Sequence, residues 1–166
     1  MYKIRPFKEQ DQPAVIELVL YIQNVEAKVG LSLGDQPDLG AINASYHDKG
    51  GAFWVAENDA GAIIGCIGLM QLSKEVGVLK KFFIAREYRG SSSKVSSALF
   101  SALTDYALSQ CLTTLILDTP SVAQRSHTFY KRAGFKQISK SDLPVPYHYP
   151  DRDSLLFMLR MPRPIV

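Results

Sequence analysis

The chain has 166 residues, of which 46% are hydrophobic and 21% charged, and its formal net charge is +3. This length suits one globular domain with a hydrophobic core of its own. The small net charge argues against a nucleic-acid partner. No apolar run approaches the roughly 20 residues that cross a bilayer, and the charged start lacks the apolar core of a secretion signal, so we expect no membrane partner.

Cysteine and histidine residues do not form a ligand pattern. Cys66 and Cys111 lie in apolar stretches typical of a core, and His47, His127 and His148 are scattered along the chain. Because metal ligands usually come in closely spaced sets, we expect no metal site. Two core cysteines fit a reducing compartment, so we expect a cytoplasmic protein.

The first part of the chain predicts a strand, a helix and a long connection. Alternating side chains indicate a strand over residues 2–6, and Asp11 is expected to cap the next helix, with Pro13 in its first turn. The apolar stripe of this helix would consist of Val15, Ile16, Val19, Ile22 and Val29. From 30 to 51 the pattern weakens around one short helix near 38–46, which is typical of a binding loop.

The middle of the chain predicts three strands and a helix. Strands are expected over 53–57, 62–72 and 76–84, the first two joined by the turn-forming residues 58–61. A helix follows over 94–109. Its apolar residues recur at the spacing of one buried helix face: Val95, Ala98, Leu99, Ala102, Leu103 and Tyr106.

The last part predicts a buried strand over 113–118, a helix, and two closing strands over 135–139 and 155–160. Ser121 and Gln124 have the spacing of a capping box, and Gly134 suits the left-handed end of the helix. No repeat or linker interrupts the chain. The element order therefore predicts one mixed α/β domain over residues 1–166.

The junction between the strand at 76–84 and the helix at 94–109 is the most informative stretch. The strand leads through Tyr88-Arg89-Gly90 and three serines to the helix N-terminus, where unpaired backbone N–H groups can bind phosphate. Basic residues cluster around it: Lys80, Lys81, Arg86, Arg89 and Lys94. We interpret the cluster as a site for a small anionic ligand, with a solvated basic face as the alternative.

Two segments resemble one family. The strand, YRG turn and helix over 82–99 resemble the acyl-CoA signature of the GNAT superfamily of N-acetyltransferases. The segment HTFYKRAGF, 127–135, resembles its late helix, in which a tyrosine precedes Gly-Phe by four residues. The resemblance implies a mostly antiparallel central sheet that splays near Ile84, flanking helices, and acetyl-CoA as the acyl donor.

The turn departs from the family pattern Arg-x-x-Gly-x-Gly or Ala. An ungapped alignment places Ser92 and Lys94 at the glycine positions. Two extra residues in the turn would place Lys94 and Ser96 there instead, and we prefer this alignment because it keeps the apolar register of the helix. Backbone N–H groups bind phosphate beside any side chain, provided that the turn can adopt the required φ angles.

The resemblance implies the cofactor site residue by residue. The backbone of Phe82, Phe83 and Ile84 would bind the pantetheine arm, whereas their side chains are expected to be core. The phosphate cradle would consist of Arg89, Gly90, Ser91, Ser92, Ser93, Lys94, Val95 and Ser96. An ordinary surface turn is the alternative.

The catalytic assignment is led by Tyr130, which the resemblance makes the acid that protonates the departing thiolate; a packed aromatic is the alternative. Many relatives carry a glutamate where this chain has Val78. The base is therefore left open among Glu75, His127, Asp118 and ordered water, and we select Glu75 as the candidate side chain.

Acceptor residues are expected in the first helix and the loop after it, where relatives build that pocket: Tyr21, Glu26 and Asp35, with Asp38 nearby. Their acidity suits a small cationic amine, although a solvated loop is equally compatible. We expect direct acetyl transfer to such an amine, and a homodimer is a further option. The alternatives are an acyl-CoA sensor without turnover, favoured by the missing glutamate, and a nucleotide-binding interaction protein.

Overall fold

The computed structural model describes residues 1–90, 92–149 and 153–162. In these residues seven strands are hydrogen bonded in the order β1-β2-β3-β4-β5-β7-β6, and β4 pairs with β5 in parallel. The strands are β1 (Tyr2–Pro6), β2 (Ala52–Asn58), β3 (Ile63–Gln71), β4 (Val76–Ile84), β5 (Thr114–Pro120), β6 (Lys136–Ile138) and β7 (Ser154–Arg160). The predicted class, α/β with a mostly antiparallel open sheet, is confirmed.

Four α-helices occur in the described parts: α1 (Gln12–Tyr21), α2 (Ile42–Ser45), α3 (Val95–Ser109) and α4 (Gln124–Arg132). Two short helices also matter for the site, the π-helix η2 (Ile22–Glu26) and the 3-10 helix η4 (Arg86–Tyr88). None of these described helices is both long and apolar enough to cross a membrane.

The chain divides into two compact units that share β4. The first comprises Met1–Met70 and Lys80–Tyr106, and the second comprises Gln71–Leu79 and Ala107–Val166. Each is described by itself below. The family-signature turn belongs to the first unit, and Tyr130 belongs to the second.

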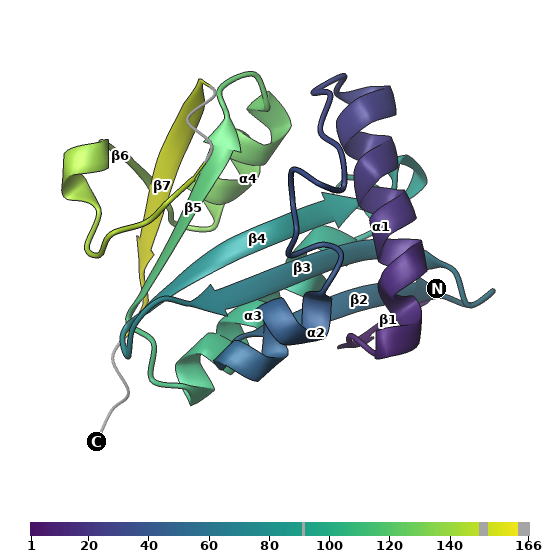
Figure 1. Cartoon of the computed structure of the whole chain (residues 1–166), viewed down its shortest axis with the longest axis horizontal. Helices are drawn as coiled ribbons and strands as arrows, with labels where there is room; N and C mark the ends of the chain where they lie inside the picture. The colour runs from purple at the N-terminus through teal and green to yellow at the C-terminus, as the bar shows by residue number, and fades with distance from the viewer. Residues whose placement is uncertain (91, 150–152, 163–166) are drawn as a thin grey trace. The chain divides into compact units, whose positions relative to one another are not determined.

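The first unit buries both faces of its strands. On one face Val15 and Val19 of α1 pack with Phe53, Val55 and Cys66 of the sheet. On the other face α3 approaches so closely that a Cβ added at Gly65 would lie 3.0 Å from a methyl carbon of Leu99. Figure 1 shows α1 and α2 in front of these strands and α3 behind them.

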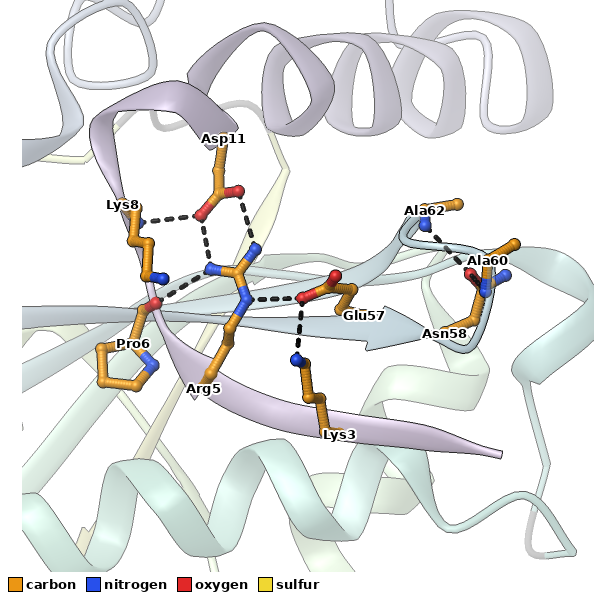
Figure 2. A network of polar contacts seen from close by, with 9 residues as sticks. All are labelled: Lys3, Arg5, Pro6, Lys8, Asp11, Glu57, Asn58, Ala60 and Ala62. Atoms are coloured by element: carbon orange, nitrogen blue, oxygen red, sulfur yellow. Dashed lines mark hydrogen bonds and ion pairs between the residues drawn. The ribbon is translucent and has the colours of Figure 1, made fainter.

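An ionic network joins the start of the first unit (Figure 2). Arg5 donates from both terminal nitrogens to the two Asp11 carboxylate oxygens, at 2.7 and 2.8 Å, and from Nε to Glu57 Oε2 at 2.6 Å. The Arg5 guanidinium lowers the pKa of Asp11, chiefly through these hydrogen bonds. The network links β1, the turn before α1, and β2.

The second unit is held by β7, which pairs antiparallel with both β5 and β6. The parallel ladder between β4 and β5 runs from Val76–Thr114 to Val78–Ile116. On α4, His127 and Tyr130 are buried, and both rings contact Phe157 of β7. Gly134 ends this helix with φ at +102°, as predicted.

Several local predictions are wrong at the helix ends. The first helix does not continue to Val29: α1 passes into the π-helix η2, and Val29 is 39% exposed. Asp11 precedes α1 but makes no side-chain cap, because its carboxylate binds Arg5 and the Lys8 N–H. The short helix expected near 38–46 is only the single turn of α2.

Two further predictions fail for a similar reason. Ser121 does not cap α4, because this helix begins only at Gln124. The Ser121 hydroxyl instead donates to Asp153 Oδ2 at 2.6 Å. Cys111 is exposed, not core, because it follows the end of α3 with φ at +61°. In each case a local pattern was outweighed by a partner or a chain reversal elsewhere in the fold.

Candidate functional site

The predicted pantetheine-binding residues form the end of β4. Phe82 and Phe83 are partly buried and Ile84 is buried, which agrees with side chains that pack while their backbone remains part of a strand. The Ala85 N–H donates to Ile64 O at 2.8 Å and closes the pairing with β3. The chain then turns through η4 to Arg89.

Arg89 connects the end of β4 to η2. Its Nε donates to Ile84 O at 2.8 Å, and its two terminal nitrogens donate to both Glu26 oxygens at 2.7 and 3.0 Å. Such a bidentate pair is the strongest form of an arginine–carboxylate contact. The structure thus brings together Arg89, expected at the cofactor, and Glu26, expected at the acceptor.

Hydrogen bonds within the serine-rich turn stabilise its conformation. The Ser93 hydroxyl lies within hydrogen-bond reach of the carbonyl oxygens of Tyr88 and Gly90, the latter at 3.2 Å. Asn58 Nδ2 donates to the Tyr88 hydroxyl at 3.1 Å and ties the turn to the β2–β3 hairpin. Ser91, a predicted cradle residue, lies outside the described residues.

The backbone of the turn meets the φ condition posed by the missing glycines. Gly90 has φ at +102°, and Lys94, at a family glycine position in both alignments, has φ at +60°. Ser92 and Lys94 are exposed, Ser96 is partly buried, and Val95 is fully buried at the start of α3. The first N–H groups of a 15-residue helix lack intrahelical partners, so the turn offers backbone donors and a lysine to a phosphate group.

A hollow of about 180 Å³ lies beside this turn in the first unit. Two predicted acceptor residues line it, Glu26 and Tyr21, and Tyr21 is 55% exposed. Asp35 is not among its lining residues and accepts hydrogen bonds from the Ser32 N–H and hydroxyl, both at 3.0 Å. The remaining lining residues are Leu18, Ile22, Ala85, Arg86 and Glu87.

A partly buried lysine on β4, Lys81, was identified from the sequence only as one member of a basic cluster. Lys81 has φ at +52° inside the strand, and its Nζ lies 3.6 Å from Asp38 Oδ2. The Tyr46 hydroxyl donates to the same oxygen at 2.6 Å. Burial lowers the pKa of Lys81, partly opposed by Asp38. These contacts attach the loop before α2 to the middle of β4.

Tyr130 lies in the second unit, 6% exposed on α4 and surrounded by Phe129, Phe135 and Phe157. Burial, and next the charge of Asp118, raise the pKa of its phenol above the ordinary value. The phenol therefore keeps its proton at neutral pH. Tyr130 is thus a packed aromatic that carries a neutral hydroxyl.

The candidate bases differ in burial and in their hydrogen-bond partners. Glu75 is exposed in the turn before β4, and its backbone oxygen accepts from the N–H groups of Thr113 and Thr114. His127 is buried, with its Nε2–H donating to Pro120 O at 2.9 Å. Asp118 accepts a hydrogen bond from the Tyr147 hydroxyl.

No group of three or more His, Cys, Asp or Glu side chains suited to a metal ion occurs among the described residues. Burial raises the pKa of the Cys66 thiol to about 12, which makes it a poor nucleophile. The chemistry offered by the described residues is that of backbone donors, a basic turn, carboxylates and a neutral phenol.

Comparisons with known proteins agree with this picture. Residues 49–137, more than half of the chain, match the family model of the acetyltransferase (GNAT) domain. A probable N-acetyltransferase family 8 member 5 from Mus musculus is 27% identical over 110 residues, which are 63% of this chain and 47% of that protein. The chain thus spans about half the length of this curated relative.

Solved structures show the same fold. An acetyltransferase from Streptococcus agalactiae is 33% identical, with a TM-score of 0.92 over 96% of this chain and 98% of that one. A PaiA N-acetyltransferase from Thermoplasma acidophilum, solved in complex with coenzyme A, is 16% identical, with a TM-score of 0.76 over 97% and 99% of the two chains. At that identity, the second likeness concerns the fold alone.

Proposed function

Because the chain belongs to the GNAT family of acetyltransferases, we propose that it transfers an acetyl group from acetyl-CoA to the amine of a small molecule. The observation that carries the proposal is the turn before α3, where Lys94 adopts a left-handed φ of +60° at a position the family gives to glycine. The turn can therefore present backbone N–H groups to a pyrophosphate without the glycines.

The reaction is direct transfer. The acceptor nitrogen attacks the thioester carbonyl carbon, the C–S bond breaks, and the thiolate takes a proton. Tyr130 is the proposed donor of that proton, because a phenol carries its proton at neutral pH and tyrosine is the donor that the family resemblance implies. A backbone N–H near Ile84 would stabilise the oxyanion, and joint binding of both substrates contributes through orientation.

The acceptor is proposed to be a small cationic amine with an apolar or aromatic part. Support comes from the hollow beside the turn, whose lining combines Tyr21, Leu18 and Ile22 with the carboxylates of Glu26 and Glu87. Glu26 is already paired with Arg89, which leaves Glu87 as the more available negative charge in that lining, where Arg86 is the neighbouring cation. For the base we retain Glu75 and ordered water as the proposed routes.

Four further expectations stay proposals. The two compact units are proposed to act as one acetyltransferase domain over residues 1–166, with a sheet that splays near Ile84 to admit the pantetheine arm. A homodimer and a cytoplasmic location also remain predictions.

Thermal unfolding with acetyl-CoA tests the proposal, with CoA and ATP as comparison ligands. A ligand at about 100 times its Kd adds about 2.7 kcal/mol, which raises the midpoint by roughly 5–10 °C for a domain of this size. We expect such a shift with acetyl-CoA and little with ATP, followed by thiol release in an amine screen. No shift with either CoA species would contradict the proposal.

A further inference from the structure

The guanidinium of Arg89 is engaged within the first unit on three sides. It holds Ile84 O through Nε and both Glu26 oxygens through its terminal nitrogens, at 2.7 to 3.0 Å. The two side chains are only 26% and 17% exposed. A phosphate that approached this arginine would have to displace a carboxylate from a bidentate pair in a partly desolvated site.

Arg5 provides an internal comparison (Figure 2). Its terminal nitrogens also form a bidentate pair with one carboxylate, Asp11, and its Nη1 reaches the backbone oxygen of Pro6 at 3.2 Å. There the arrangement links β1 to the chain before α1. Arg89 likewise pairs both terminal nitrogens with one carboxylate, and its Nε binds a backbone oxygen, so it connects β4 to η2 in a comparable way.

We propose that Arg89 is a positioning residue which fixes the cofactor turn to η2, and that phosphate binding is left to the turn's backbone N–H groups and Lys94. The inference rests on the proposed function, since it concerns how coenzyme A is held. Ser93 also stabilises the turn and does not bind phosphate, because its hydroxyl donates to carbonyl oxygens of the turn itself.

The pair also links the two proposed substrate sites. Glu26 lines the hollow proposed for the acceptor, and Arg89 begins the turn proposed for the cofactor. An acceptor that contacts Glu26 would act on the anchor of the cofactor turn, so each substrate alters the affinity for the other. This coupling depends on the ion pair between Glu26 and Arg89 and requires no larger conformational change.

The direction in which one substitution changes the affinity for CoA distinguishes this role from direct phosphate binding. Glu26→Gln removes a negative charge near the turn, which by Coulomb's law alone strengthens the binding of a polyanion and would also release Arg89 toward phosphate. If Arg89 positions the turn, the same change loosens the anchor and weakens binding. Arg89→Lys retains the charge but loses the planar fork.

The experiment measures the Kd of CoA by calorimetry for the wild type, Glu26→Gln, Arg89→Lys and Arg89→Gln at one salt concentration. The matched control is Glu17→Gln, which removes an exposed carboxylate from α1. We expect Glu26→Gln to weaken binding about fivefold to tenfold, the size of one lost ordinary hydrogen bond. Arg89→Lys should bind as weakly as Arg89→Gln, and Glu17→Gln should bind as the wild type does.

Tighter CoA binding by Glu26→Gln, or wild-type affinity of Arg89→Lys, would overturn the inference and leave the proposed function standing. If the wild-type chain binds no CoA, both the proposed function and this inference are overturned. Thermal unfolding establishes that each variant folds, and Arg89→Lys decides the question if Glu26→Gln does not fold. As a readout without ligand, the terminal Nη–H groups of Arg89, which donate to Glu26, should exchange slowly by NMR in the wild type and rapidly in Glu26→Gln.

Discussion

The turn before α3 and the α4 face around Tyr130 are built by different forces. The turn consists of polar side chains and two left-handed residues, Gly90 and Lys94, held by hydrogen bonds to carbonyl oxygens. The α4 face consists of Tyr130 in contact with Phe135 and Phe157. Substitutions in the turn should therefore act on backbone shape and ligand affinity, whereas substitutions on α4 should act on packing or on the chemical step.

The largest expected effect tests the chemical side of that contrast. Tyr130→Phe should lower kcat by about 100-fold or more, the usual contribution of a general acid, because the ring keeps its packing but loses its proton. The Kd of CoA and the midpoint of unfolding should change little. Steady-state thiol release with an identified amine acceptor measures the effect.

The control for that variant is Tyr106→Phe on α3. Its hydroxyl donates to Gly50 O at 3.2 Å, so this change costs about 1 kcal/mol of stability and should leave kcat unchanged. A Tyr130→Phe enzyme that turned over at close to the wild-type rate would assign Tyr130 to packing alone.

Two glycines with the same φ of +102° compare the regions directly. An alanine Cβ at Gly134 would lie 3.3 Å from Leu159 Cδ1, whereas one at Gly90 would meet no atom within 4 Å. Gly134→Ala should therefore lose about 2 kcal/mol of unfolding free energy, from left-handed strain and crowding, and Gly90→Ala about 1 kcal/mol.

CoA titration and chemical denaturation of both variants provide the measurement. Gly90→Ala should also weaken CoA binding, because strain in the turn misplaces its N–H groups, while Gly134→Ala should leave CoA affinity intact. The opposite pattern, with stability lost at Gly90 and affinity at Gly134, would break the comparison.

Lys94→Gln should weaken CoA binding roughly threefold to fivefold at low salt, the size expected of one exposed charge contact. The difference should shrink at 0.5 M salt because exposed charges are screened. Lys49→Gln, an exposed lysine elsewhere in the first unit, is the control. Equal losses for the two variants would point to overall charge in place of a local phosphate contact.

The last prediction concerns the pH dependence of stability. The folded pKa of Tyr130 is raised by burial, so above pH 10 the unfolded chain releases this proton first and stability falls as the pH rises. Between pH 10 and 11 the wild type should lose about 1 kcal/mol more than Tyr130→Phe does. Urea unfolding at pH 9, 10 and 11 measures this, and parallel curves would contradict a buried phenol.

Sequence patterns were most accurate where the structure depends on near neighbours. The strand predicted over 76–84 is β4, and the helix predicted over 94–109 is α3 to within one residue, because α3 carries a regular apolar face and β4 is apolar on both sides of Lys80 and Lys81. The first helix was predicted less well. Its apolar spacing continues past Tyr21, but the backbone there adopts the wider π-helical turn of η2, which spacing alone does not reveal.

The candidate site divides in the same way. Arg89, Lys94 and Tyr130 were identified from short motifs, since each stands at a fixed distance from a turn or a glycine. The residues that contact these side chains in the fold were not identified from the sequence. Glu26 lies 63 positions from Arg89, and Asp38 and Lys81 come from separate elements, so no local pattern pairs them.

By itself, the sequence determined the class of fold, the order of its elements, the signature turn and the family that they resemble. These follow from local periodicity, turn chemistry and motif spacing, all of which act over a few residues. The tertiary structure alone decided that Arg89 binds Glu26, that Asp11 binds Arg5 and does not cap α1, and that Lys94 adopts a left-handed φ of +60°. Those outcomes depend on which distant groups meet in a partly desolvated place, where the strongest available partner prevails over local preference.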